Sequence, residues 1–353
     1  MQAKGGERRT PFPLFNPASP IGAFSRVGSA CKEGRALKLS CVFREWRQLA
    51  KPVPSDAELF PVPQNTSLVV PFGYRPKLVP PERRIAVFFH AYYVQELADA
   101  IDLQLRNLPV LVDIYFTTDT GEKAVLLNER FQSHPRIRRL KTTITANRGR
   151  DIYPKIGLMN QEHLAYDYVL HIHTKRSGHE DGLRDWRQFL WQHLLGSPEI
   201  VTSVFEIFER CPDVGMIAPQ HLPFIRPWIH WADCKELAAG LGPHLAKAIG
   251  GIENIDFPSG SMFWARSKAL KPLLDLNLVA TDFPEENGQL SLTNAHAIER
   301  LFFISCELAG LKWLKIALPQ WHAASDQLQS ASSPWIVRRF VDKRNVNLLP
   351  GGN

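Results

Sequence analysis

The sequence predicts an α/β protein with a mostly parallel central sheet and flanking helices. Apolar runs at residues 85–90, 110–117 and 168–173 are continuous rather than alternating, as in strands that are buried on both faces. Between the first two runs, residues 94–108 carry leucine and isoleucine at helical spacing. Strands that alternate with helices of this length indicate βαβ crossover units, and such units form parallel sheets.

Composition divides the chain into three parts. Residues 1–83 hold 12 of the 27 prolines and are predicted to be a basic N-terminal extension with one short amphipathic stretch. Residues 84–318 carry the α/β pattern, and residues 319–353 are predicted to be a C-terminal tail. Further strands are expected at 137–143, at 214–219 and within 257–265, and helices at 122–131, 153–162, 183–210, 235–247, 267–274 and 294–309.

The formal net charge of +7 favours anionic partners. Nucleic acid is not expected as a partner, because Lys and Arg form no basic stripe interleaved with aromatic residues. No segment approaches the roughly 18 apolar residues of a membrane span, and the N-terminus does not resemble a secretory signal. We therefore expect a cytoplasmic protein. The amphipathic stretch at 36–49 fits either packing on its own domain or peripheral contact with the inner face of the plasma membrane.

The end of the run at 168–173 is the first candidate for ligand binding. His171 and His173 are followed by Thr174, Lys175, Arg176 and Ser177. Ligands of open α/β sheets bind outside the carboxyl ends of the strands, so these donors and cations predict a site for an anionic ligand. His-x-His is also the first half of a metallohydrolase ligand set, but later strand ends supply no clear partner. The five scattered cysteines suit neither a disulfide framework nor a zinc site.

A second candidate is the segment Asn147-Arg148-Gly149-Arg150-Asp151, between a predicted strand and a predicted helix. Glycine allows a ligand to approach the backbone, and arginines can clamp phosphate. The alternative is an ordinary tight turn in which Asp151 caps the helix.

Three further groups could carry chemistry. Ser259, Gly260 and Ser261 resemble a loop that lines a pocket, and Trp264 offers either a face for a sugar or a core side chain. The segment from Asp282 through Glu285 to Gln289 places carboxylates in a loop. On the helix that follows, Glu299 could act as a general base with His296 one turn earlier.

Taken together and in order, these motifs resemble the rhamnan synthesis protein F family of bacterial polysaccharide glycosyltransferases. The resemblance covers roughly residues 84–315 and includes the segments at 147–151, 171–177, 257–266, 282–289 and 295–301. It implies a Rossmann-like nucleotide-binding sandwich similar to that of the A-type glycosyltransferases. It also implies transfer of a sugar, with rhamnose as the first candidate, from a nucleotide-diphosphate sugar to a growing cell-envelope glycan.

The resemblance places the strand of His171 and His173 where A-type enzymes usually hold an Asp-x-Asp metal site. Histidine and lysine cannot bind magnesium as paired carboxylates do, so we expect no metal and no cofactor. Lys175, with Arg148 or Arg150, would neutralise the leaving diphosphate in a single displacement. The bases considered are Glu299, then Asp282 and Glu285, while Asp151 would orient the donor.

The expected partners are a nucleotide sugar, a lipid-linked or polymeric glycan acceptor, and other polysaccharide-assembly transferases. Two other classes remain open at this point. One is a non-catalytic module that binds glycan or nucleotide, and the other is the metal-dependent hydrolase that the His-x-His pattern suggests.

Overall fold

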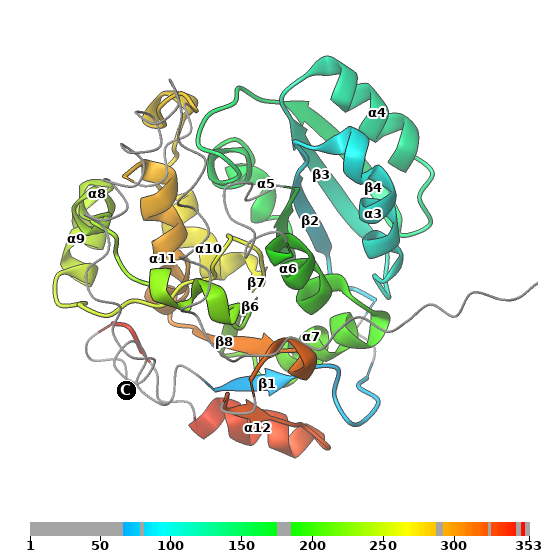
Figure 1. Cartoon of the computed structure of the whole chain (residues 1–353), viewed down its shortest axis with the longest axis vertical. Helices are drawn as coiled ribbons and strands as arrows, with labels where there is room; N and C mark the ends of the chain where they lie inside the picture. Colours follow the sequence, from blue (N-terminus) through cyan, green and yellow to red (C-terminus); the bar gives the residue numbers. More distant parts are fainter. Residues whose placement is uncertain are drawn as a thin grey trace, which may run out of the picture. The chain divides into compact units, whose positions relative to one another are not determined.

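A nine-stranded sheet runs through the part of the chain that the structure, a computed structural model, describes: residues 66–77, 81–174, 185–286, 292–323, 326–343 and 347–349. All of these residues belong to the unit Pro54–Asn353 (Figure 1). The strand order is β4-β3-β2-β5-β7-β6-β8-β1-β9. Strand β7 is antiparallel to β5 and β6, and every other pair described is parallel. The predicted α/β class with a mostly parallel sheet is therefore confirmed.

The strands are β1 (Ser67–Val69), β2 (Ile85–His90), β3 (Val112–Thr118), β4 (Ile137–Ile144), β5 (Tyr168–His173), β6 (Val214–Pro219), β7 (Phe263–Arg266), β8 (Lys312–Ala317) and β9 (Leu328–Gln329). Strands β2 and β5 are neighbours in the interior of the sheet, third and fourth in the strand order, and every residue of both is buried. Their continuous apolar sequences follow from this position, because a strand covered on both faces has no solvent side.

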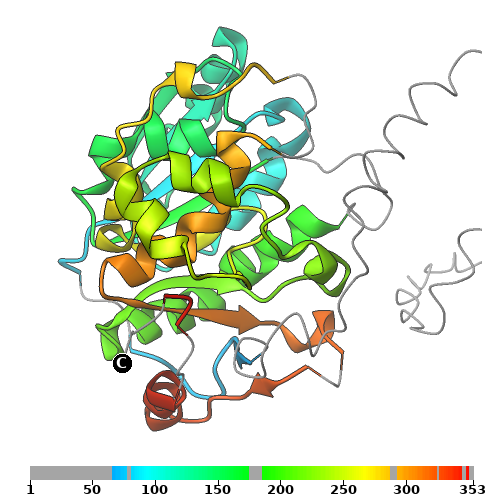
Figure 2. The same cartoon turned by 90° about the vertical axis from the view of Figure 1, so that its left-hand side faces the viewer.

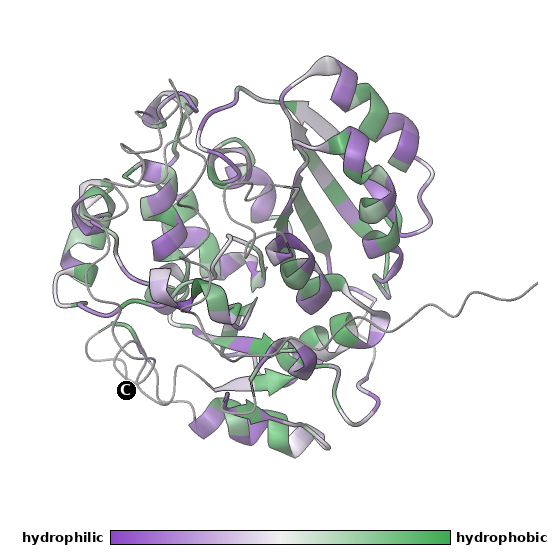
Figure 3. Cartoon of the chain, in the orientation of Figure 1, coloured by the Kyte–Doolittle hydropathy of each residue, from purple (hydrophilic) through white to green (hydrophobic). Residues whose placement is uncertain are grey.

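Helices cover both faces of the sheet. Successive side chains of a strand point to opposite faces, so Val87 and Phe89 join one hydrophobic cluster while Ala86 and Phe88 join the other. The first cluster contains α3 (Val94–Arg106), α4 (Gly121–Phe131), α6 (Trp186–Leu195), α7 (Pro198–Arg210) and α12 (Pro334–Lys343). The second contains η3 (Tyr153–Gly157), α8 (Lys235–Gly240), α9 (Pro243–Ile249), α10 (Ser267–Leu274) and α11 (Asn294–Leu308). Figure 3 shows the hydrophobic residues along β2, between these layers.

Two predicted helices are interrupted. The predicted helix 183–210 is divided into α6 and α7, because the Ser197 hydroxyl caps the backbone N–H of Ile200 and Pro198 begins a new helix. The predicted helix 153–162 is the π-helical turn η3 followed by the short α5 (Asn160–His163). π-Helical turns are rare and occur frequently at functional sites.

The boundaries drawn from composition differ from those of the sheet. β1 falls in the predicted N-terminal extension, yet it pairs with β8 and β9. β9 and α12 fall in the predicted tail, yet β9 closes one edge of the sheet and Val337 of α12 is fully buried in the first cluster (Figures 1 and 2). β1 and β9 have three and two residues, too few for a periodic pattern to register. α12 does carry apolar residues at helical spacing, Val337 and Val341, which the division by composition passed over. None of the described helices has the length and apolar character required to cross a membrane.

Candidate active site

The candidate site lies at the carboxyl ends of β2 and β5. Thr174, immediately after β5, joins the two strand ends: its hydroxyl oxygen accepts hydrogen bonds from the backbone N–H groups of Tyr92 (2.8 Å) and Tyr93 (3.0 Å). Its own N–H donates to the carbonyl of His90 at 3.0 Å. Burial lowers the pKa of His90 to about 4, so this ring is neutral at pH 7. The edge is therefore rigid and built from neutral donors and acceptors.

The turn at residues 258–261, just before β7, forms hydrogen bonds with ionisable side chains from three other elements. The ring of His173 donates from Nε2 to the carbonyl of Gly260 at 2.8 Å. The Gly260 N–H donates to Oε1 of Glu299 at 2.9 Å, and Lys155 donates to the carbonyl of Ser261 at 3.0 Å. Gly260 and Ser261 have φ of 80° and 54°, in the left-handed region that a non-glycine residue rarely adopts. β5, α11 and η3 thus converge on one strained turn.

Behind this turn lies a buried ion pair. Nζ of Lys155 is 3.0 Å from Oδ2 of Asp151, and both side chains are more than nine-tenths buried. His173 Nε2 is 3.7 Å from the same carboxylate oxygen. Burial lowers the pKa of Lys155, while the Asp151 carboxylate raises it. Asp151 therefore acts as the counter-ion of a buried cation and is not a solvent-exposed helix cap.

A second buried network supports the same turn from the side of β6 and β8. His221 donates from Nε2 to Oδ1 of Asp256 at 2.9 Å, which leaves Nδ1 to accept from the Ser259 hydroxyl at 3.0 Å. Lys315 donates to the other Asp256 oxygen at 2.5 Å. Burial opposes ionisation of Asp256, but Lys315 and His221 outweigh it and lower its pKa to about 2. The network anchors Ser259, the residue next to Gly260.

The arginines of the 147–151 segment pair with acidic residues of the later loop. Arg148 donates to Oε1 of Glu285 at 2.6 Å and to the carbonyl of Phe283 at 3.0 Å. Arg150 lies 3.6 Å from Glu286. The loops at 147–151 and 283–286, far apart in sequence, therefore lie side by side. Asn147 is exposed at their rim.

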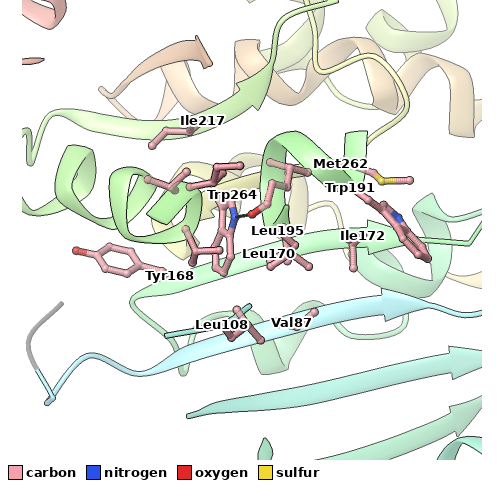
Figure 4. Packing of buried hydrophobic residues seen from close by; sticks show 14 of the residues in the cluster. Val87, Leu108, Tyr168, Leu170, Ile172, Trp191, Leu195, Ile217, Met262 and Trp264 are labelled. Atoms are coloured by element: carbon pink, nitrogen blue, oxygen red, sulfur yellow. Dashed lines mark hydrogen bonds between the residues drawn. The ribbon is translucent and has the colours of Figure 1, made fainter. Parts of the chain in front are cut away.

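Two predicted site residues belong to the core. His171 is fully buried among Phe88, Phe263 and Phe302, and its Nε2 lies 2.7 Å from that of His163. Trp264 is also fully buried, and its indole N–H donates to the carbonyl of Leu194 at 3.1 Å (Figure 4). The expectation that His171 and Trp264 bind substrate is wrong for this reason: neither ring reaches solvent.

The other predicted site residues form local structural contacts, lie outside the described residues, or, in the case of Glu299, reach solvent. The Asp282 carboxylate accepts a hydrogen bond from the Val279 N–H and so closes the 3-10 turn η6 (Ala280–Asp282). His296 contacts the hydroxyl of Thr293 at 2.7 Å, at the start of α11. Lys175, Ser177 and Gln289 lie outside the described residues. Glu299, with about a fifth of its side chain exposed, is the carboxylate that both joins the turn and reaches solvent.

The His-x-His pattern does not converge on a metal. His171 faces His163, while His173 binds the Gly260 carbonyl. Within the described ranges, no group of three or more His, Cys, Asp and Glu side chains is arranged to hold a metal ion. Among the described residues, the Glu299 carboxylate suits proton transfer, and Arg148 and Arg150 can bind an anion in competition with Glu285 and Glu286.

The fold and the site define the class of the protein: an α/β protein whose candidate site lies at the carboxyl edge of a mostly parallel sheet. Residues 62–307 match the family described as rhamnan synthesis protein F, and the chain belongs to that family. Membership confirms the resemblance drawn from the motifs and associates the chain with polysaccharide biosynthesis.

The chain is also similar to a protein described as uncharacterized protein WxcX in two strains of Xanthomonas campestris pv. campestris. In both strains the identity is 34% over 232 residues, which is 64% of this chain and 31% of the relative. The chain thus spans about a third of the length of these relatives.

Among solved structures, the chain is similar to CMP:2-keto-3-deoxy-manno-octonic acid synthetase complexed with CTP. The TM-score is 0.33 at 8% identity, covering 72% of this chain and 96% of the other. A TM-score at this level carries no argument about this chain.

Proposed function

We propose that this protein is a glycosyltransferase that moves a sugar, with rhamnose as the first candidate, from a nucleotide-diphosphate sugar to a growing cell-envelope polysaccharide. One observation carries the proposal. The Glu299 carboxylate, in the segment 295–301 near the start of α11, accepts a hydrogen bond from the Gly260 N–H and still reaches solvent. A carboxylate that is both oriented and accessible suits a general base. Membership of the rhamnan synthesis protein F family supports a role in polysaccharide biosynthesis, with which this proposal agrees.

In the proposed single displacement, the acceptor hydroxyl attacks the anomeric carbon of the donor while Glu299 takes the hydroxyl proton. The bond from that carbon to the diphosphate breaks, and the diphosphate leaves with the bonding electrons. Asp282 and Glu285 are weaker candidates for the base, because Asp282 caps a turn and Glu285 pairs with Arg148. Asp151 would act through Lys155, holding the 258–261 turn in place and thereby the base.

The leaving diphosphate needs positive charge. Arg148 and Arg150 are adjacent to the site but already pair with Glu285 and Glu286, so a diphosphate must compete with those carboxylates. In the sequence, Lys175 is two residues after the end of β5, so it is our first candidate, with the arginines assisting. We propose that no divalent metal takes part. Loss of all transfer activity in EDTA, restored by manganese, would refute that part of the proposal.

The decisive experiment offers a panel of nucleotide sugars, starting with deoxythymidine-diphosphate rhamnose, to the purified protein. A ligand at a hundred times its dissociation constant stabilises the fold by about 2.7 kcal/mol, so thermal shift identifies the donor. Slow donor hydrolysis, followed by release of nucleoside diphosphate, then shows catalysis. Stabilisation by a nucleotide sugar without hydrolysis or transfer would instead support the non-catalytic binding module.

The acceptor is proposed to be a lipid-linked or polymeric glycan at the inner membrane face. Because the chain spans about a third of the matching relatives, we also propose that it acts beside other polysaccharide-assembly transferases. Co-purification with such transferases from a producing cell would test this association.

A further inference from the structure

A cavity of about 530 Å³, open to solvent, is lined by residues of α8, the loop before it and the beginning of α11. The two helices pack against each other (Figure 1). Its walls combine three apolar side chains with three that accept or donate hydrogen bonds. These are Leu237, Leu241 and Leu292, and Asp233, Glu236 and Asn294. The functional assignment above uses none of them.

The charge of this cavity is opposite to that of the protein as a whole. Asp233 and Glu236 contribute two carboxylates, and among the described ion pairs neither is matched with a cation. A nucleotide diphosphate would be repelled by these carboxylates. A neutral polyhydroxyl ligand fits: its hydroxyl groups donate to carboxylates and its C–H faces pack on leucine.

The backbone around the cavity is held in an uncommon conformation. Ala232, Asp233 and Leu292 have φ of 45°, 61° and 62°. Such residues are uncommon and persist where the surroundings enforce them, often at ligand sites. In the part of the chain that the structure describes, two of the other three non-glycine residues with positive φ, Arg150 and Ser261, are at the candidate active site.

The cavity shares α11 with the proposed base. Asn294 is the first residue of α11 and Glu299 follows five residues later, which is about 7.5 Å along the helix axis at 1.5 Å per residue and about 140° around it at 3.6 residues per turn. The loop before α8 is tied to the same helix, because Arg300 donates to the carbonyl of His230 at 2.9 Å. An extended glycan of several sugar units that runs around α11 from the cavity can present its end to Glu299.

An aromatic pair flanks this loop. Phe224 and Trp228, on the 3-10 helix η5 (Pro223–Trp228), have ring centroids 5.1 Å apart and are 41% and 37% exposed. Two prolines and the buried bidentate pair of Arg226 with Asp326 (2.8 and 2.6 Å) fix this helix. Rigid exposed aromatic rings are surfaces on which sugar rings can pack.

We infer that this cavity, lined by Asp233, Glu236 and Asn294, is the binding site for a neutral saccharide of the acceptor. The assignment of the saccharide as an acceptor rests on the proposed function, but saccharide binding itself can be measured without any transfer. It assigns the anionic donor and the neutral acceptor to two different places on the protein.

The experiment uses the full chain and saturation-transfer NMR with methyl glycosides of rhamnose, mannose, galactose, glucose and N-acetylglucosamine. Deoxythymidine diphosphate serves as the anionic comparison. A Cβ at Gly240 would meet nothing within 4 Å, so Gly240→Leu fills the cavity without crowding the fold. Gly250→Leu, at the end of the next helix and in ordinary contact only, is the matched control.

We expect at least one glycoside to bind the wild type, with binding reduced at least tenfold in Gly240→Leu and in Asp233→Asn/Glu236→Gln. Gly250→Leu should bind as the wild type does, and nucleotide binding should be unchanged throughout. Asn tolerates the left-handed backbone of residue 233, so the double variant should fold normally.

Three results would overturn the inference: no glycoside bound, binding unchanged in the cavity variants, or nucleotide binding lost with them. If the glycosides bind as expected but no nucleotide or nucleotide sugar binds the wild type, the cavity assignment holds and the proposed transferase function fails. The two proposals are therefore separable.

Discussion

Oε1 of Glu299 lies 2.9 Å from the backbone nitrogen of Gly260, and this hydrogen bond joins α11 to the turn before β7. The two residues are 39 apart in sequence. The bond fixes one carboxylate oxygen on the turn, while the other lies 4.0 Å from a guanidinium nitrogen of Arg300 and 21% of the side chain remains exposed. The buried side chains of Lys155, His173 and His221 contact the same 258–261 turn. Glu299 is therefore the partly exposed member of this otherwise buried group.

The first prediction concerns Glu299→Gln. The amide oxygen of glutamine can still accept from the Gly260 N–H, so the fold and donor binding should be retained. Glutamine cannot take a proton, so turnover should fall at least about a hundredfold. The measurement is release of nucleoside diphosphate at saturating donor, with donor affinity from thermal shift.

The control for this variant is Glu253→Gln, which removes a carboxylate that is 87% exposed and whose partner is Lys235. It should leave turnover unchanged. Near-normal turnover in Glu299→Gln, with the control also normal, would remove Glu299 from the role of base.

Parts of the site formed by residues close together in the sequence could be predicted, whereas contacts between residues far apart in the sequence could not. The strands that frame it, β2 and β5, were predicted because each is a continuous apolar run. Glu299 and Gly260 were both singled out, but no pattern indicates that they bond to each other. Trp264 could not be assigned, because a tryptophan in a strand has the same sequence signal whether it faces the core or a ligand.

The buried ionisable residues gave still weaker signals. Lys155 follows Asp151 by four residues, which is a helical ion-pair spacing and the only local sign of that contact. Lys315 stands within the apolar run 311–318, where a charge requires a buried partner, but that partner, Asp256, is 59 residues earlier. Arg148 and Glu285 were each predicted as free functional groups, and the structure pairs them over 137 residues. Contacts of this kind exist only once the fold has formed.

The second prediction concerns Lys155→Met. The change leaves Asp151 buried without its cation, which should destabilise the protein by roughly 3–5 kcal/mol. The double variant Asp151→Asn/Lys155→Met removes both charges and should recover most of that loss. Urea unfolding at pH 7 measures each value.

The control is Lys271→Met, since Lys271 and Asp275 form a pair with the same spacing but with more than half of each side chain exposed. Its loss should cost at most about 0.5 kcal/mol. Equal effects of the two lysine changes would show that the Asp151–Lys155 pair has no special role in the fold.

The third prediction concerns Gly149→Ala. Gly149 has φ of 65°, and a Cβ there would lie 2.7 Å from the Phe283 ring and from Cβ of Tyr153. Gly310 has φ of 71° with nothing within 4 Å, so Gly310→Ala measures the cost of the backbone conformation alone, about 1–2 kcal/mol. Gly149→Ala should cost about 1–3 kcal/mol more, because the added methyl also crowds the 147–151 and 283–286 loops. Matching values in urea unfolding would contradict the close packing of these loops.

The last prediction concerns acid sensitivity. Burial lowers the pKa of His90, His163 and His221 to about 4, against about 6.5 in an unfolded chain. Between these values the unfolded chain binds more protons than the folded one, so the free energy of unfolding must fall as pH drops from about 6.5 to about 4. Each ring contributes on the order of 3 kcal/mol at the lower limit, so most of the stability should be lost over this range.

Urea midpoints at pH 7.5, 6 and 5 measure the loss, and His244→Gln, which removes an exposed histidine, should leave the slope unchanged. An unfolding midpoint that does not move between pH 7.5 and 5 would contradict the burial of these three histidine rings as neutral groups.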